Sequence, residues 1–310
     1  MIKLYLYKIK KYIKNFPTRL LNTLRLLTLP TKSYIFVNMS VKWKGLSLVN
    51  YNFGDDLNVY LIEELTHKKV LKYDEFLHLN KANLLCIGSI IEYLCDNHST
   101  IWGSGALFGN KHLSYNPKKV IAVRGPLTRH YLQLQSIECP NIYGDPALLL
   151  PLVYSPVSKK KYKIGFIPHY KDLYYPVLRQ FVSDHTDCII IDFQNYDSWK
   201  EVIELIVSCK MIASSSLHGL IISDAYKVPN IRVKFSDLIV GGDFKFNDYM
   251  QGVNRKIYKP LDCSHTINGD DIEQLIQKYK PINYDISGLL RTFPLTLANE
   301  YKKRLNAHLK

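Results

Sequence analysis

A short segment near the middle of the second half combines the groups most able to do chemistry. Ser214, Ser215 and Ser216 stand between an apolar run and a Leu-His-Gly sequence that contains His218. The two apolar runs predict a buried strand and then a helix, which places the serines and the histidine at a helix N-terminus. Such an end offers unpaired N–H donors and a partial positive charge, so it favours anions. Alternatively, the serines only cap the helix and His218 packs in the core.

Three other residues could bind an anionic ligand. Arg124 precedes a Gly-Pro pair that opens a predicted helix, and a guanidinium there could bind a phosphate or carboxylate. Its alternative role is a surface arginine paired with an acid. Lys245 is a second candidate cation. His169 follows a predicted strand and could bind an anion or move a proton, although a surface loop histidine is the alternative.

Acidic residues mark two turns. Asp55 and Asp56 follow Gly54 at the start of a predicted helix, where acids are favoured by capping and by the helix dipole. We interpret one of them as a cap and the other as a candidate base for a hydroxyl proton. Asp145 precedes Pro146 and is predicted to fix a turn.

The elements that must position these groups alternate along the chain. Apolar runs predict strands at 70–73, 84–87, 100–102, 120–123, 162–167, 188–193, 211–213 and 231–235. Helices are predicted at 55–66, 126–134, 173–183, 198–208, 217–226 and 286–309. Alternation of this kind predicts an α/β fold with parallel sheets, whose ligand sites lie at strand C-terminal ends.

The length of 310 residues favours two domains, and an exposed-looking lysine run after residue 156 favours a boundary there. We therefore predict an arm at 1–33, a first Rossmann-like domain at 34–156 and a second at 157–310 that faces the first across a cleft. The last helix is predicted to fold back towards the first domain.

Composition excludes several classes of protein. Hydrophobic residues make up 47% and charged residues 22% of the chain, which is typical of a globular protein. The six cysteines include no CxxC pair, so we expect a reduced cytosolic protein with neither disulfides nor a zinc site. No phosphate-binding P-loop, zinc-protease motif or nucleophile elbow occurs, and we expect no metal.

The positive charge is concentrated at the start of the chain. Of the net charge of +14, ten charges lie before Asp55, the first acid, and aromatic and aliphatic residues interleave with them. The bases are Lys3, Lys8, Lys10, Lys11, Lys14, Arg19, Arg25, Lys32, Lys42 and Lys44. This composition predicts that residues 1–33 form an amphipathic helix on an anionic membrane surface, with the protein on the cytoplasmic, inner face. The alternatives are a solvated arm or a nucleic-acid contact, but no nucleic-acid module signature is present.

Seven short motifs in a fixed order carry a family resemblance. They are NFGDDLN (52–58), WGSG (102–105), VRGPLT (123–128), GDPALLLP (144–151), IGFIPHY (164–170), SSSLHG (214–219) and DFKFNDY (243–249). With them the chain resembles the polysaccharide pyruvyl transferases, from about residue 50 to about residue 250. Some members of that family have an arginine where this chain has Ser216, so here another residue must supply that anion contact.

The resemblance implies a GT-B-like fold and a reaction. The family transfers the enolpyruvyl unit of phosphoenolpyruvate to two hydroxyls of a sugar and forms a cyclic ketal. It implies His218 with Asp55 or Asp56 as catalytic groups, and no cofactor beyond phosphoenolpyruvate as co-substrate. The residues expected to bind phosphoenolpyruvate are Arg124, His169, Ser214, Ser215, Ser216, His218 and Lys245. The loops expected on the acceptor side contain Asn52, Gly54, Gly103, Ser104 and Gly105.

We expect a lipid-linked glycan precursor as the acceptor and no nucleic-acid partner. Two other functions stay open at this point. One is a GT-B glycosyltransferase that uses a nucleotide sugar, although no acidic motif marks a nucleotide site. The other is a non-catalytic anion-binding protein with the same fold.

Overall fold

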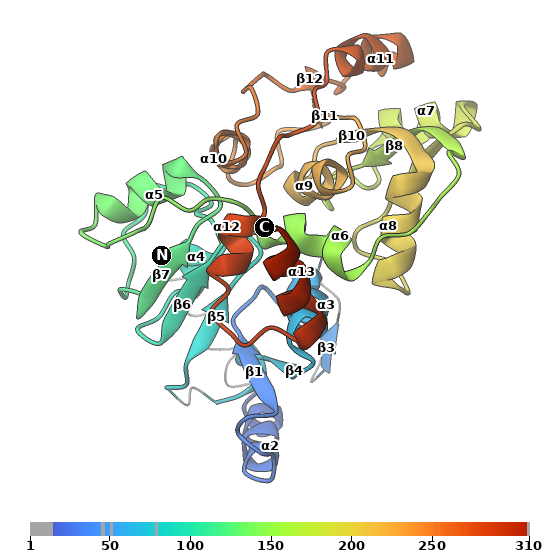
Figure 1. Ribbon diagram of the computed structural model, residues 1–310. Coiled ribbons are helices and arrows are strands. Elements are labelled where there is room, and N and C mark those ends of the chain that lie inside the picture. The colour runs from blue at the N-terminus through green and yellow to red at the C-terminus, as the bar shows by residue number, and fades with distance from the viewer. Residues whose placement is uncertain (1–14, 45–46, 50–51, 78–79, 309–310) are drawn as a thin grey trace.

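Two five-stranded parallel sheets form the framework of the protein. The computed structural model describes residues 15–44, 47–49, 52–77 and 80–308. The first sheet has the order β4-β1-β5-β6-β7 and the second has the order β12-β11-β10-β8-β9, and every neighbouring pair within them is parallel (Figure 1). The predicted α/β class is confirmed, and the arrangement is consistent with two Rossmann-like units.

The strands of the first sheet are β1 (Tyr34–Val37), β4 (Lys69–Lys72), β5 (Asn83–Leu85), β6 (Ser99–Trp102) and β7 (Lys119–Ala122). Those of the second are β8 (Tyr162–Ile167), β9 (Cys188–Ile190), β10 (Cys209–Ser214), β11 (Asn230–Lys234) and β12 (Leu261–Asp262). A separate antiparallel pair joins β2 (Lys42–Lys44) to β3 (Ser47–Val49). The strands are rich in β-branched residues whose side chains fill the layers between sheet and helices.

Helices connect the strands, as alternation requires. The first half contains α2 (Phe16–Leu26), α3 (Phe53–Thr66), α4 (Ile91–Leu94), α5 (Pro126–Gln133) and α6 (Leu150–Val153), with short 3-10 helices η1 (Tyr73–Glu75) and η2 (Pro146–Leu149). The second half contains α7 (Pro176–Asp184), α8 (Trp199–Ser208), α9 (Leu217–Ala225), α10 (Phe244–Gly252) and α11 (Gly269–Gln277), followed by α12 (Ser287–Arg291) and α13 (Asn299–His308). Across the described residues, no helix is long and apolar enough to cross a bilayer.

Local sequence explains several helix starts. Proline stands in the first turn of α5 and of α7, where its missing N–H has no intrahelical partner to lose. Ser198 caps α8 by accepting a hydrogen bond from the Lys200 N–H at 3.3 Å. The helices predicted over 55–66, 126–134, 198–208 and 217–226 are therefore confirmed to within two residues.

Two predicted boundaries were wrong for identifiable reasons. The strand predicted over 188–193 ends at Ile190, because the Asp192 carboxylate accepts the Gln194 N–H at 2.7 Å and turns the chain. The helix predicted over 173–183 begins only at Pro176, after a turn in which the Tyr175 N–H donates to the Asp172 carbonyl at 3.0 Å.

The single helix predicted over 286–309 is also wrong. Pro294 separates α12 from α13, because proline lacks an N–H and disfavours helical geometry in the residue before it. Both helices pack against the first half of the chain (Figure 1). The Trp102 indole N–H donates to the Leu289 carbonyl at 3.2 Å, and the Ala298 N–H donates to the Leu65 carbonyl at 2.8 Å. The domain boundary after residue 156 stays a prediction.

One buried apolar cluster extends through both halves. It includes Leu61 of α3, Trp102 of β6, Ile203 of α8, Leu220 of α9 and Leu289 of α12. All five side chains are fully buried, so the two halves share an apolar core instead of meeting through polar loops. That shared core fixes the facing ends of the two sheets relative to each other.

The helix α2 corrects one part of the predicted arm. Residues 1–14 lie outside the described residues. Arg19, one of the ten leading bases, is only 3% exposed and pairs with Asp74 at 2.7 Å. It therefore belongs to the protein interior and not to the surface expected to contact lipid.

Candidate active site

Two helix N-termini, one from each half, meet between the sheets. β10 ends at Ser214 and α9 begins at Leu217, as the sequence predicts. The imidazole of His218 lies against the first turn of α3: a Cβ built on Gly54 would come 1.8 Å from its Nδ1 atom. Two segments separated by more than 160 residues thus form one site, and glycine at position 54 leaves the room for the ring.

His218 is the central group of this site. It is 7% exposed, and its Nε2 atom finds no hydrogen-bond partner within the described chain. Burial, then the charges of Arg124 and Lys245, lowers the pKa of His218 to about 3, so the ring is neutral in the ligand-free protein. Buried polar atoms normally have partners, so an unpartnered Nε2 argues against a purely structural core histidine.

The three serines divide between structure and site. Ser214 Oγ donates to the Ile167 carbonyl at 2.9 Å and accepts the Ser216 N–H at 3.0 Å. Ser215 Oγ accepts the His169 N–H at 2.8 Å and donates to Asp172 at 3.2 Å. Both therefore fasten the turn to the end of β8.

Ser216 is different. It occupies the N-cap position of α9, yet in the part of the chain that the structure describes its side chain makes no capping hydrogen bond. The first turn of α9 thus carries a partial positive charge beside the neutral ring of His218. An anion would find both groups there, and ligand binding by the three serines stays a prediction.

Asp55 and Asp56 have different environments although they are adjacent. Burial, then the charge of Asp56, raises the pKa of Asp55 to about 7, against the opposing effects of Asn52 and Lys245. Asn52 Nδ2 lies 3.4 Å from Asp55 Oδ2, which is a weak contact. Asp56 accepts a hydrogen bond from the Tyr196 hydroxyl at 2.8 Å, which ties the start of α3 to the second half. Asp55 therefore titrates near neutrality, as a catalytic base should.

Arg124 is enclosed by protein. It is 0% exposed, and its guanidinium donates to Asp248 at 3.0 Å, to the Ala106 carbonyl at 2.7 Å and to the Ser89 hydroxyl. Gly105 makes room for it, since a Cβ there would lie 2.2 Å from the guanidinium carbon. The contact of Arg124 with phosphoenolpyruvate stays a prediction, and the three hydrogen bonds of its guanidinium in this structure all go to protein groups.

Asp248 was not singled out from the sequence as a site residue. Besides pairing with Arg124, its carboxylate accepts the Thr128 N–H at 2.8 Å and the Thr128 hydroxyl at 2.6 Å. It thereby fixes α10 to the start of α5. Only its place in the DFKFNDY motif could have drawn attention to it, because its partner lies 124 residues away.

Lys245 is a buried cation whose charge acts on the residues of the site. It is 7% exposed, and its Nζ donates to the Val240 carbonyl at 3.0 Å. Burial, then the charges of Arg124 and Arg232, lowers the pKa of Lys245 to about 8. Its charge lowers the pKa values of His218, Asp55 and His169. For His169, burial and then the charge of Lys245 lower the pKa to about 3. The structure thus brings these predicted residues into one electrostatic cluster.

The loop after β6 packs against Arg124 through Gly105. Ser104 is fully buried, and its hydroxyl donates to the Gly88 carbonyl at 2.8 Å. Gly103 has a φ of +85° and packs against the Pro146 ring, a conformation and contact that suit glycine. These residues shape the framework around Arg124, and a role in acceptor binding stays a prediction.

Asp145 combines the predicted turn with an unexpected feature. Its Oδ1 accepts the Ala147 N–H at 3.0 Å, which confirms the turn. Its Oδ2, however, is buried and lacks a hydrogen-bond partner among the described residues. Burial raises the pKa of Asp145 to about 7, although the Ala147 N–H and Arg124 act in the opposite direction. The sequence signalled only the Asp-Pro turn.

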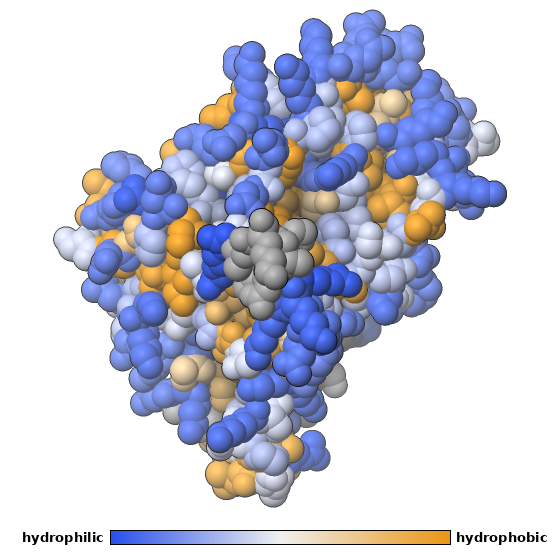
Figure 2. Space-filling view, in the orientation of Figure 1, coloured by the Kyte–Doolittle hydropathy of each residue, from blue (hydrophilic) through white to orange (hydrophobic). Residues whose placement is uncertain are grey.

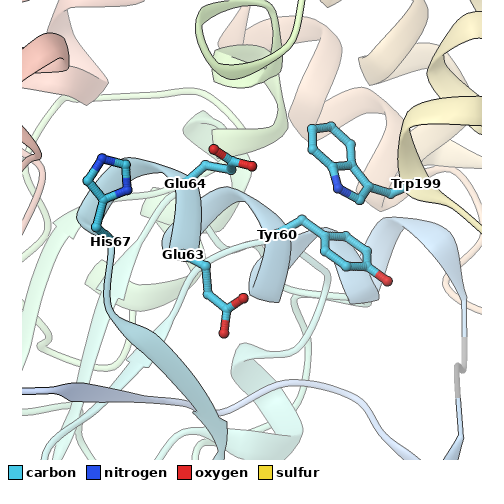
Figure 3. A pocket seen from close by; sticks show the side chains of 5 residues that line it. All are labelled: Tyr60, Glu63, Glu64, His67 and Trp199. Carbon is cyan, nitrogen blue, oxygen red and sulfur yellow. The ribbon is translucent and has the colours of Figure 1, made fainter.

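A pocket of about 310 Å³ lies apart from this cluster, further along α3. Figure 3 shows its five lining side chains, Tyr60, Glu63, Glu64, His67 and Trp199, none of which was predicted as a site residue. The rings of Tyr60 and Trp199 stack with centroids 5.7 Å apart, and His67 pairs with Glu300 at 2.7 Å. Over the described residues, no group of three or more acidic, histidine or cysteine side chains could hold a metal ion.

The contact between Gly54 and His218 makes a direct prediction. Alanine is intrinsically favoured over glycine in a helix by roughly 1 kcal/mol, so Gly54→Ala should not weaken α3 itself. Its Cβ would instead displace the imidazole, and we expect a large loss of turnover in a steady-state assay. Gly288→Ala is the matched control, because its Cβ would meet only Ile142 at 3.8 Å. Normal turnover by Gly54→Ala would show that the ring need not lie there.

Comparisons with known proteins match most of the segments that form this site. A family model described as polysaccharide pyruvyl transferase matches residues 52–236, which include Gly54, Asp55, Arg124 and His218. An uncharacterized protein of Acanthamoeba polyphaga mimivirus is 30% identical over 217 residues, covering 67% of this chain and 74% of its own. The succinoglycan biosynthesis protein ExoV of Rhizobium meliloti (strain 1021) is 30% identical over 207 residues, covering 64% of this chain and 61% of its own.

No solved structure matches the chain. The family match covers more than half of its 310 residues and contains the two helix N-termini that meet between the sheets. The chain belongs to the polysaccharide pyruvyl transferase family.

Proposed function

We propose that the protein transfers the enolpyruvyl unit of phosphoenolpyruvate to two hydroxyls of a sugar and forms a pyruvate ketal. The observation that carries the proposal is the unpartnered, buried Nε2 of His218 at the N-terminus of α9, whose ring lies against Gly54, the residue before Asp55 in the first turn of α3. The name of the ExoV relative supports exopolysaccharide biosynthesis as the process.

Phosphoenolpyruvate carries a phosphate and a carboxylate, and the cluster offers groups that suit both. The first turn of α9 and the Ser216 side chain can donate hydrogen bonds to one anion. Lys245 supplies a buried positive charge that water screens little. A bound dianion would favour the protonated form of His218 and would thereby reverse the effect of burial on its pKa.

The reaction adds one proton to carbon and removes one proton from each of the two sugar hydroxyls. The methylene carbon of phosphoenolpyruvate gains a proton, which leaves an oxocarbenium-like centre on the neighbouring carbon. One sugar hydroxyl attacks that carbon and gives up its proton, and phosphate then leaves with the electrons of its C–O bond. The second hydroxyl attacks the same carbon, loses its proton and closes the ketal ring. Of the two protons released, one balances the proton added to carbon and the other is taken up by the departing phosphate. His218, protonated in the presence of the anion, is our acid, and Asp55, whose pKa is near 7, is our base.

We propose a glycan precursor attached to a lipid as the acceptor, used on the cytoplasmic side of a membrane. The support is the concentration of bases and the absence of acids before Asp55, which favours a membrane surface over free solution. Nine of the ten bases count toward it, because Arg19 pairs with Asp74. No metal or further cofactor enters the scheme, because Lys245, His218 and the helix N-terminus can stabilise departing phosphate.

Ligand stabilisation separates this function from transfer of a nucleotide sugar. We expect phosphoenolpyruvate to raise the melting temperature, because a ligand that binds only the native state at a hundred times its dissociation constant stabilises it by about 2.7 kcal/mol. Uridine diphosphate sugars should leave the melting temperature unchanged in the same differential scanning fluorimetry experiment.

His218→Ala is the internal control, since it should lose most of the shift with phosphoenolpyruvate. A shift with a uridine diphosphate sugar and none with phosphoenolpyruvate would favour the glycosyltransferase instead. Phosphate release in the presence of a panel of lipid-linked sugars then tests the complete reaction.

A further inference from the structure

The helix α2 is attached to the first half through its polar side. Arg19, which is buried, pairs with the partly exposed Asp74 at 2.7 Å. Asn22 Nδ2 donates to the Glu75 carbonyl at 3.2 Å, and Thr23 Oγ1 accepts the Leu77 N–H at 3.1 Å. Asn22 and Thr23 follow Arg19 by three and four positions, so the three residues share one face of the helix.

One apolar residue completes the attached face. Leu26 is 7% exposed and packs in a small cluster with Phe36, Leu71, Tyr73 and Phe76. The ion pair, the two hydrogen bonds and this packing hold α2 against the segment that follows β4. The helix is therefore a fixed part of the first half.

An adjoining face of α2 is apolar and exposed. The exposed fractions are 53% for Leu24 and 82% for Leu27, and the other members of the face are Phe16, Leu20 and Leu21. Phe16, Leu20, Leu24 and Leu27 follow one another at spacings of four, four and three, so they form a continuous stripe. Figure 2 shows hydrophobic surface at the end of the molecule where Figure 1 places α2.

This orientation is the reverse of the usual one. A helix on the surface of a globular protein normally buries its apolar stripe and turns its polar side to water. Here the polar side is attached through a buried arginine and the apolar stripe faces outward. Contiguous exposed apolar surface of this kind marks a site that another surface covers.

Charge indicates which surface that is. The 54 residues before the first acid, Asp55, carry ten bases, and within the described part Arg25 and Lys32 are exposed beside the stripe in sequence. An anionic bilayer offers hydrocarbon to the leucines and negative headgroups to the bases at once. We propose that the outward stripe of α2 inserts into the surface of an anionic membrane while Arg19 holds the helix to the protein.

The proposal does not depend on which reaction the active site catalyses. It differs from general attraction of a basic arm to lipid, because it assigns the contact to one face of one described helix. It also predicts that insertion keeps the folded body attached at a fixed angle to α2, since the Arg19–Asp74 pair lies outside the inserted stripe.

Sedimentation with vesicles tests the proposal on the full chain. We expect the protein to sediment with vesicles of phosphatidylglycerol and phosphatidylcholine, and much less with phosphatidylcholine alone. Leu24→Glu/Leu27→Glu should weaken binding by roughly tenfold or more, because both carboxylates would face the acyl region. Leu134→Glu/Leu275→Glu is the matched control on exposed leucines of other surfaces and should bind like the unaltered chain.

A second measurement detects insertion itself. Leu24→Trp should show a blue-shifted emission on anionic vesicles and quenching by brominated acyl chains. Equal binding of both double variants, or no quenching at Leu24→Trp, would overturn the proposal. A chain that ignores vesicles but dimerises in sedimentation equilibrium, and that Leu24→Glu/Leu27→Glu makes monomeric, would assign the stripe to a second copy instead.

These outcomes are separable from the proposed reaction. Phosphate release with a short water-soluble acceptor reports the site alone, and it should be the same for both double variants. Thermal unfolding of each variant shows that the fold is retained. Loss of vesicle binding with full activity therefore tests α2, whereas loss of activity with full vesicle binding tests the site.

Discussion

Replacing His218 with alanine is expected to lower kcat by roughly a hundredfold or more, the usual effect of losing an acid–base group. The expected loss is large because His218 lies in the first turn of α9 and its buried Nε2 atom has no hydrogen-bond partner among the described residues. The fold should survive, because the substitution removes a polar atom whose burial is not offset by a hydrogen bond. Steady-state phosphate release and thermal unfolding measure the two effects.

His130→Ala is the matched control, since His130 is an exposed residue of α5 outside the cluster. It should retain full turnover. If His218→Ala were equally active and folded, the assigned role of this histidine would be wrong. If it unfolded instead, the alternative interpretation of His218 as a core residue would gain support. Phosphoenolpyruvate binding by a folded His218→Asn variant would then decide between ligand contact and core packing.

Replacing Asp55 with asparagine is expected to lower kcat by about a hundredfold to ten-thousandfold, because a general base contributes on that scale. Asp56→Asn should lose less, since Asp56 is already bonded to the Tyr196 hydroxyl. A base must be deprotonated, and burial raises the pKa of Asp55 to about 7. We therefore expect kcat of the unaltered protein at saturating phosphoenolpyruvate, where the bound anion keeps His218 protonated, to rise with pH and to level off above about pH 7.

Asp145 provides the control for that pH profile, because burial also raises its pKa to about 7. The rise near pH 7 should persist in Asp145→Asn and should disappear from the residual activity of Asp55→Asn. The reverse pattern would transfer the base to Asp145. A flat profile in the unaltered protein between pH 5 and 9 would contradict both assignments.

Much of the fold could be predicted because its signals are local. Apolar runs with strand and helix periods located most strands of both sheets, and Pro126 and Ser198 marked the starts of α5 and α8. The errors arose where a side chain acts on the backbone, as with Asp192 beyond β9 and Pro294 between α12 and α13. Periodicity alone does not report such turns.

The site was predicted less completely, because its defining contacts are distant in sequence. The strand, serine turn and helix around His218 are one local unit, and their chemistry follows from residue types. That the ring lies on Gly54, or that Asp248 encloses Arg124, depends on how two sheets come together. Likewise, composition predicted an amphipathic α2, but the outward direction of its apolar stripe depends on Asp74, 55 residues beyond Arg19.

The position of α12 and α13 on the first half affects how the chain folds during synthesis. Leu289 supplies the carbonyl for the buried Trp102 indole, and Ala298 completes the last turn of α3 at Leu65. The strands of the first sheet are all translated by residue 122, but these partners emerge some 170 residues later. At ribosomal speeds that interval lasts on the order of 10–40 s. During that interval the surfaces of the first half that α12 and α13 later cover stay exposed to water.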